Sequence, residues 1–256
     1  MKPIINKYVF RKTSNDSGSL TTMSSIIHKV AEQGKYSGIV FLGDIKVGKF
    51  FIRVGESREE AQEEGVPLQQ IDIDLSSFNN STGVNGNSTA FTLLAGGHIV
   101  FYVSKGSKEY AVEIFRLGKQ KEPIKVFDSR LLGDEDLFIT HVMKPGSYSV
   151  RNVMGGGQAI LTVEYPEHEK LMRNMESVLI ECRNGTMDPA EIKIQPLQTL
   201  MFSCTRESRI NIELKMAEER PQPALAPIIT PVAILKKKKT GEVGQKNIRR
   251  RIQFFG

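Results

Sequence analysis

The chain has 256 residues, of which 39% are hydrophobic and 25% are charged, and its 35 basic and 29 acidic side chains give a formal net charge of +6. This balance is typical of a globular protein with one large or two ordinary domains, and it excludes a fibrous or wholly disordered chain. The first residues lack the apolar stretch of a secretory signal, and the apolar run 223–235 is too short and proline-rich to span a bilayer.

In chain order, the first expected element is a helix over 22–33, because its apolar residues follow the three-and-four spacing of one helical face and Gly34 stands as a stop. Two further short helices are expected over 57–64 and 167–177. Elsewhere, short apolar or alternating runs predict strands over 38–42, 49–54, 70–75, 90–94, 98–103, 110–116, 137–142, 146–150, 159–165, 178–183, 191–195, 199–205 and 209–214. The polar segment 78–89 is expected to be an exposed loop.

Strands at this spacing, without long helices between them, favour a mainly β protein built as an antiparallel sandwich or barrel. A faint internal repeat relates 95–103 and 110–114 to 196–204 and 210–214, so two tandem β units are plausible. The expected organisation is an N-terminal helix and hairpin region at 1–66, a β-sandwich domain at 67–166, a smaller β unit at 167–216 and an extended arm at 217–256.

Several segments resemble a known family. These are Gly97-His98-Ile99-Val100-Phe101, Phe127-Asp128-Ser129, Lys144-Pro145-Gly146-Ser147-Tyr148-Ser149-Val150, Gly157 to Val163, and Gly185 to Ile194, which starts a second such unit. Together they are similar to cupredoxin-like sandwiches over a third of the chain, so the expected fold is cupredoxin-like or jelly-roll-like. The family places a copper-binding Cys soon after the Pro-Gly-x-Tyr turn, with a His and often a Met following. Here only Met154 matches, so the resemblance implies a sandwich without the copper site.

The motifs that could carry chemistry have simpler interpretations. Gly43 to Lys49 has phosphate-loop spacing, but Phe50 replaces the required Ser or Thr and a strand follows, which favours a hairpin turn. The glycines of 155–157 could cradle an anion, or they could form a turn with positive φ.

The ionisable residues likewise define no catalytic or metal centre. The four histidines (His28, His98, His141 and His168) show no ligand spacing, so no metal and no cofactor are expected. Asp72 and Asp74 share one strand face, and Asp134 to Asp136 are expected to be a solvated turn. Cys182 and Cys204 are expected to pack as small apolar groups in a reducing compartment, cytoplasmic or inside a virion or other particle.

Charge is segregated along the chain. Residues 221–256 hold eight basic side chains and one acidic one, a net charge of +7, whereas residues 1–220 carry −1. This arm is expected to bind an anionic partner through Lys236, Lys237, Lys238, Lys239, Lys246, Arg249, Arg250 and Arg251, with Ile228, Ile229, Val232, Phe254 and Phe255 as apolar anchors. A tail that only aids solubility is the simpler alternative.

The sequence therefore favours a non-enzymatic structural subunit that joins a larger assembly, as capsid or scaffold subunits do, through the arm. Its expected partners are other protein subunits in an oligomer or complex. Two alternatives remain open: an accessory protein that contacts nucleic-acid phosphates through the arm, and a cupredoxin-like redox carrier.

Overall fold

The computed structural model describes residues 11–56, 69–80, 89–118, 122–165 and 175–218, all within one compact unit that spans residues 1–220. Strands make up most of these residues, and one short 3-10 helix, η2 (Leu75–Asn80), accompanies them, so the mainly β prediction is confirmed. The helix expected over 57–64, most of the one expected over 167–177 and most of the 78–89 loop lie outside the described residues.

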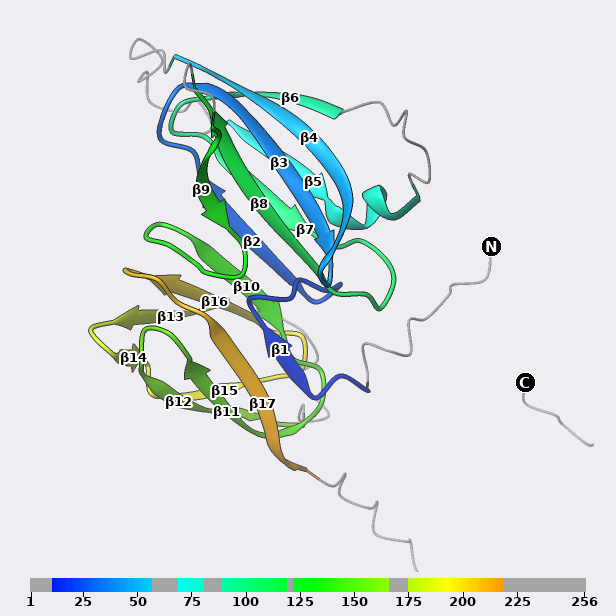
Figure 1. The fold of residues 1–256 in the computed structure, drawn as a ribbon. Helices are drawn as coiled ribbons and strands as arrows, with labels where there is room; N and C mark the ends of the chain where they lie inside the picture. The colour runs from blue at the N-terminus through cyan, green and yellow to red at the C-terminus, as the bar shows by residue number, and fades with distance from the viewer. Residues whose placement is uncertain (1–10, 57–68, 81–88, 119–121, 166–174, 219–256) are drawn as a thin grey trace, which may run out of the picture. The chain divides into compact units, whose positions relative to one another are not determined.

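The first of two sandwiches has a five-stranded outer sheet in the order β6-β4-β3-β8-β9 (Figure 1). Its strands are β3 (Gly34–Leu42), β4 (Ile45–Gly55), β6 (Thr89–Leu94), β8 (Tyr110–Leu117) and β9 (Ile124–Asp128). They cover β2 (Ser24–Lys29), β5 (Gln70–Asp74) and β7 (His98–Tyr102). Phe101 of β7 joins the two layers, because its ring lies 6.3 Å from that of Phe50 and stacks at 5.6 Å on that of Phe127.

The second sandwich has an outer sheet in the order β1-β17-β11-β12-β15. Its strands are β1 (Ser14–Asp16), β11 (Gly146–Asn152), β12 (Gln158–Val163), β15 (Glu191–Ile194) and β17 (Ile210–Ala217). The facing strands are β10 (Leu137–His141), β13 (Val178–Arg183), β14 (Thr186–Asp188) and β16 (Thr199–Cys204). Val150, Leu161, Phe202 and Ile212 are fully buried between the layers and form its core.

The inner layers of the two sandwiches are one continuous sheet of seven strands, in the order β14-β13-β16-β10-β2-β7-β5. The junction is the antiparallel pair β2 and β10, where Ile26 lies opposite Phe138. Both side chains are fully buried, and the buried apolar residues of both sandwiches form one cluster. The described strands therefore share a single core.

The helix expected over 22–33 is wrong, because residues Ser24–Lys29 form β2 in the middle of this sheet. β2 pairs with β7 on one side and β10 on the other. Ile26 and Ile27 point to opposite faces, as alternate residues of a strand do. Their β-branched side chains suit a central strand, and this tertiary pairing overrides the helical spacing.

Purely antiparallel sheets were expected, whereas the observed sheets contain both parallel and antiparallel pairs. The pairs β4 with β6, β5 with β7, β12 with β15, and β13 with β16 are parallel. Parallel neighbours need a long crossover, and here the chain visits the opposite layer between them. Strand pairing also joins β3 and β4, before residue 66, with β6 and β8 after it. The predicted domain boundaries remain predictions.

Apart from β14, which has no counterpart among the described strands of the first sandwich, the two sandwiches use the same strand order and pairing, in agreement with the predicted internal repeat. β3 and β11 both begin with Gly-x-Tyr-Ser, and each tyrosine hydroxyl donates a 2.6 Å hydrogen bond to the carbonyl four residues earlier: Tyr36 to Glu32 and Tyr148 to Lys144. Phe101 of β7 lies opposite Ile26, and Phe202 of β16 lies opposite Phe138. These partners match the predicted alignment of 95–103 with 196–204.

The first strand of each repeat pairs with the last strand of the other repeat. β1 begins the first repeat and pairs with β17, which ends the second. β9 begins the second repeat and pairs with β8, which ends the first. A shared Asp-Ser-x-x-Leu turn follows both strands, and its serines, Ser17 and Ser129, are fully buried. Each serine exchanges two 2.9 Å hydrogen bonds with the backbone of one residue, Ile210 or Val112 respectively. These turns carry the chain from one sandwich to the other.

We expect Ser17→Ala and Ser129→Ala to lower the free energy of unfolding by similar amounts, roughly 1–3 kcal/mol each, because each leaves a buried backbone N–H without its acceptor. Urea unfolding followed by circular dichroism measures the change. Ser107→Ala, at an exposed turn, is the control and should stay within about 0.5 kcal/mol of the original protein. A much smaller loss at one turn would contradict their structural equivalence.

Candidate functional site

The arm residues predicted to bind a partner all lie outside the described residues. They are the cations Lys236, Lys237, Lys238, Lys239, Lys246, Arg249, Arg250 and Arg251 and the anchors Ile228, Ile229, Val232, Phe254 and Phe255. The described chain ends just after β17, where the N–H of Glu218 donates a 3.1 Å hydrogen bond to the carbonyl of Pro145. The arm therefore follows directly from the outer sheet of the second sandwich.

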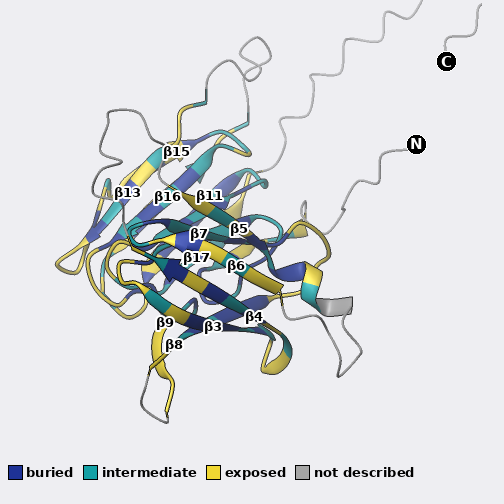
Figure 2. Cartoon of the chain, turned by 90° about the horizontal axis from the view of Figure 1, so that it is seen from above, coloured by how far each residue is buried: buried dark blue, intermediate teal, exposed yellow. Residues whose placement is uncertain are grey.

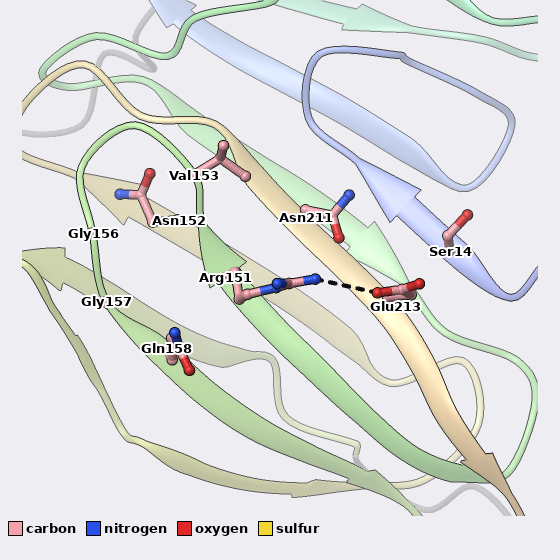
Figure 3. Close-up of a pocket in the computed structure, with 9 residues that line it drawn as sticks. All are labelled: Ser14, Arg151, Asn152, Val153, Gly156, Gly157, Gln158, Asn211 and Glu213. Carbon is pink, nitrogen blue, oxygen red and sulfur yellow. Dashed lines mark hydrogen bonds and ion pairs between the residues drawn. The ribbon is translucent and has the colours of Figure 1, made fainter.

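An open pocket of about 560 Å³ lies over this outer sheet (Figure 3). It is lined by Ser14, Arg151, Asn152, Val153, Gly156, Gly157, Gln158, Asn211 and Glu213. Nη2 of Arg151 on β11 contacts Oε2 of Glu213 on β17 at 3.3 Å, and Lys215 contacts the same oxygen at 2.6 Å. The hydrogen bond and charge of Lys215, followed by Arg151, lower the pKa of Glu213. Of the residues that line the pocket, Arg151 and Glu213 thus compensate each other.

The glycine loop beside the pocket is a turn with positive φ, one of the two predicted alternatives. Gly156 and Gly157 have φ values of 75° and 91°. A Cβ on Gly157 would lie 3.0 Å from the backbone of Thr186, so close packing on the β13–β14 turn also requires glycine. The Asn152 carboxamide, which is nearly buried, accepts the N–H of Gly155 at 2.9 Å and fixes the loop. Local geometry therefore accounts for these glycines without a ligand.

The two cysteines lie side by side on parallel strands. Cys182 of β13 is in register with Cys204 of β16, and both are buried free thiols. The hydrogen bond with Cys204, together with burial, raises the pKa of the Cys182 thiol. One residue beyond the last pair of β5 and β7 in the first sandwich, Leu75 and Val103 occupy the equivalent positions, and both are buried. Packing as small apolar groups explains the thiols, as predicted.

The segment with phosphate-loop spacing is the predicted hairpin. Leu42 of β3 pairs with Ile45 of β4 across the two-residue turn Gly43-Asp44, and Gly43 has a φ of 58°. The preceding strand enters no helix here, so no helix N-terminus is available to hold a phosphate.

One carboxylate of the acidic turn has a structural role that sequence analysis missed. Asp134 and Glu135 are exposed as expected, but Asp136 is only 3% exposed. Its two oxygens contact Nδ1 of His28 at 2.7 Å and the N–H of Gly133 at 2.7 Å. Among the described residues, no group of three or more His, Cys, Asp or Glu is arranged to hold a metal ion.

Asp74 is also a structural carboxylate. Its oxygens accept hydrogen bonds from the N–H and hydroxyl of both Ser76 and Ser104. Burial acts to raise the pKa of Asp74, but these hydrogen bonds outweigh it and hold the pKa below its ordinary value. Asp72, two residues earlier, is exposed and contacts Gln70 at 2.7 Å. Asp74 therefore fastens the end of β5, and the two carboxylates show no acid–base arrangement.

Comparisons with protein-family models, with curated proteins and with solved structures found no match. The resemblance to cupredoxin-like domains therefore remains a prediction. No helix in the described ranges is long and apolar enough to cross a membrane.

We expect Asp74→Asn to lower the free energy of unfolding at pH 7 by about 1 kcal/mol, because the ionised form makes the stronger hydrogen bonds. The pKa is depressed in the folded protein, so this stabilisation is present at neutral pH and is lost as the pH falls below about 4. The difference between variant and original protein should shrink over that range in urea unfolding. Asp72→Asn is the matched control, and an equal loss there would contradict the assignment.

The thiols of Cys182 and Cys204 should react with a thiol reagent only when the protein unfolds, because both are buried and the first is protonated at neutral pH. Cys204→Val should change stability by less than about 1.5 kcal/mol, since valine occupies the equivalent position of the first sandwich. Labelling in native buffer and in urea, read by mass spectrometry, tests this. Fast native labelling would show an accessible, reactive site instead.

Proposed function

We propose that the protein is a non-catalytic subunit of a larger assembly, and that it attaches to an anionic surface through the arm, residues 221–256. The observation that supports this is the charge distribution: +7 in the arm against −1 in the other residues. A cationic segment of this density attracts phosphates or acidic protein surfaces over about 10 Å at moderate ionic strength.

Ion pairs within the compact unit reinforce this separation of roles. The guanidinium of Arg209 contacts both oxygens of Asp16 at 2.9 Å, and Arg130 lies 3.2 Å from Glu113. Such internal pairs reduce the field that these cations present to a partner. The arm has only Glu242 to offset its eight cations. The largest net attraction to an anionic partner is therefore expected from the arm.

The attachment point supports a positioning role for the compact unit. β17 is held between β1 and β11 in the outer sheet, and the arm follows it. A partner that binds the arm would thus fix the second sandwich directly. The apolar residues Ile228, Ile229, Val232, Phe254 and Phe255 would supply contacts that pure charge does not, since buried apolar groups carry most binding energy at interfaces.

Replacing Lys236–Lys239 and Arg249–Arg251 with Gln should abolish recovery of the partner in a pull-down from native lysate at about 150 mM salt. Raising the salt should release the partner from the original protein. Treating the eluate with nuclease then separates nucleic acid from acidic protein as the anion. A variant with Lys105 and Lys193 of the compact unit changed to Gln is the control. Recovery of the same partners by the arm variant and by the original protein would reject the proposal.

A further inference from the structure

The outer sheet of the first sandwich presents a face that has no role so far. Over residues 49–54 of β4, buried residues alternate with exposed or partly exposed ones (Figure 2), and the register places Lys35 of β3 beside Arg53 and Ile39 beside Lys49. Between these rows, the small Ser37 lies between Phe51 of β4 and Phe115 of β8. We call Lys35, Ile39, Lys49, Phe51, Arg53 and Phe115 the first outer face.

The cations of this face are available to a partner. Lys35, Lys49 and Arg53 are exposed, and none of them has a carboxylate within 4.0 Å among the residues that the structure describes. At the margin of the face, the carboxylates of Glu113 and Asp128 are already contacted by Lys125 and Arg130. Within the described part of the chain, the centre of the face therefore has an uncompensated positive charge.

Two aromatic rings accompany these cations. Phe51 and Phe115 are partly exposed, although a sheet face in water usually carries polar residues. They lie two strand spacings apart, about 10 Å, with only Ser37 between them. Nζ of Lys49 lies 4.9 Å from the centre of the Phe51 ring. Aromatic planes and cations are thus interleaved on one surface.

The second sandwich shows that the fold does not require these side chains. Its pairing places Ser147 beside Thr162, Ser149 beside Ile160 and Arg151 beside Gln158, with Glu213 beside Ser149. Each residue of the first outer face therefore has an equivalent in the second sandwich. Ser147 is equivalent to Lys35, Thr162 to Arg53, Gln158 to Lys49, Ile160 to Phe51, Glu213 to Phe115 and Arg151 to Ile39. The second set has no net charge and no aromatic ring. The same strand geometry is stable with either set.

We infer that the first outer face binds single-stranded nucleic acid. Lys35, Lys49 and Arg53 would contact phosphates, and the rings of Phe51 and Phe115 would stack on unpaired bases. Paired bases in a duplex are already stacked on one another and present no free face to these rings. An acidic protein would need the cations but not the aromatic planes. This site is separate from the arm and goes beyond the proposed function.

The test uses the full chain with Lys236–Lys239 and Arg249–Arg251 changed to Gln, so that binding by the arm does not mask the face. Fluorescence anisotropy with a labelled oligothymidylate of about 12 nucleotides reports affinity. Phe51→Ile with Phe115→Leu keeps apolar volume but removes both rings, and should weaken binding about tenfold or more with little change in salt dependence. Lys35→Ser, Lys49→Gln and Arg53→Thr together should weaken binding and lower the slope of log affinity against log salt by about 2.

Ile160→Leu with Lys193→Gln, on the outer sheet of the second sandwich, is the matched control and should leave affinity unchanged. Thermal unfolding confirms that each variant is folded at the assay temperature. The inference is overturned if the arm-neutralised chain does not bind the oligonucleotide, or if only the cation variant weakens binding, which would show contact with phosphates without stacking of bases on the two rings. Either result leaves the arm proposal intact, because the pull-down tests that separately.

Discussion

The antiparallel pairing of β2 with β10 is the contact on which the rest of the structure depends. It joins two sandwiches of the same strand order into one sheet, with Ile26 and Phe138 buried at the junction. Because equivalent strands meet in antiparallel orientation, the two sandwiches are related by an approximate two-fold rotation. The exchange of β1 and β9 follows from the same arrangement, since each repeat supplies the edge strand of the other.

Local patterns predicted many strands but not their partners. The alternation in 98–103 and 199–205 identified β7 and β16, because half-buried strands alternate apolar and polar residues. The same rule failed at β2, where Ile26, Ile27 and Val30 also fit a helical face. Parallel pairing could not be predicted, since it depends on where the chain goes between strands. The repeat was visible only near residues 95–103 and 196–204, because few positions besides Gly-x-Tyr-Ser and Asp-Ser-x-x-Leu are identical.

Candidate sites were predictable to different degrees. Charge alone marks the arm, because its cations are consecutive in sequence. The first outer face was missed because its residues come from β3, β4 and β8, and only strand pairing brings them together. One signal was present: Lys49, Phe51 and Arg53 alternate within β4, and such spacing points all three to one side of a strand. The equivalent residues of the second sandwich show that sequence there diverged on the surface while the buried positions stayed apolar.

The clasp between β1 and β17 determines how the protein would resist a mechanical load. Three residue pairs, centred on Asn15 and Ile212, join β1 to β17. The bidentate contact of Arg209 with Asp16 lies at one end of this pairing. A load along β17 would act across its hydrogen bonds to β1 and β11, which run perpendicular to the strands. These bonds would have to rupture together in shear and could not peel apart one by one. Within the described chain, β17 is therefore a strand that can carry force.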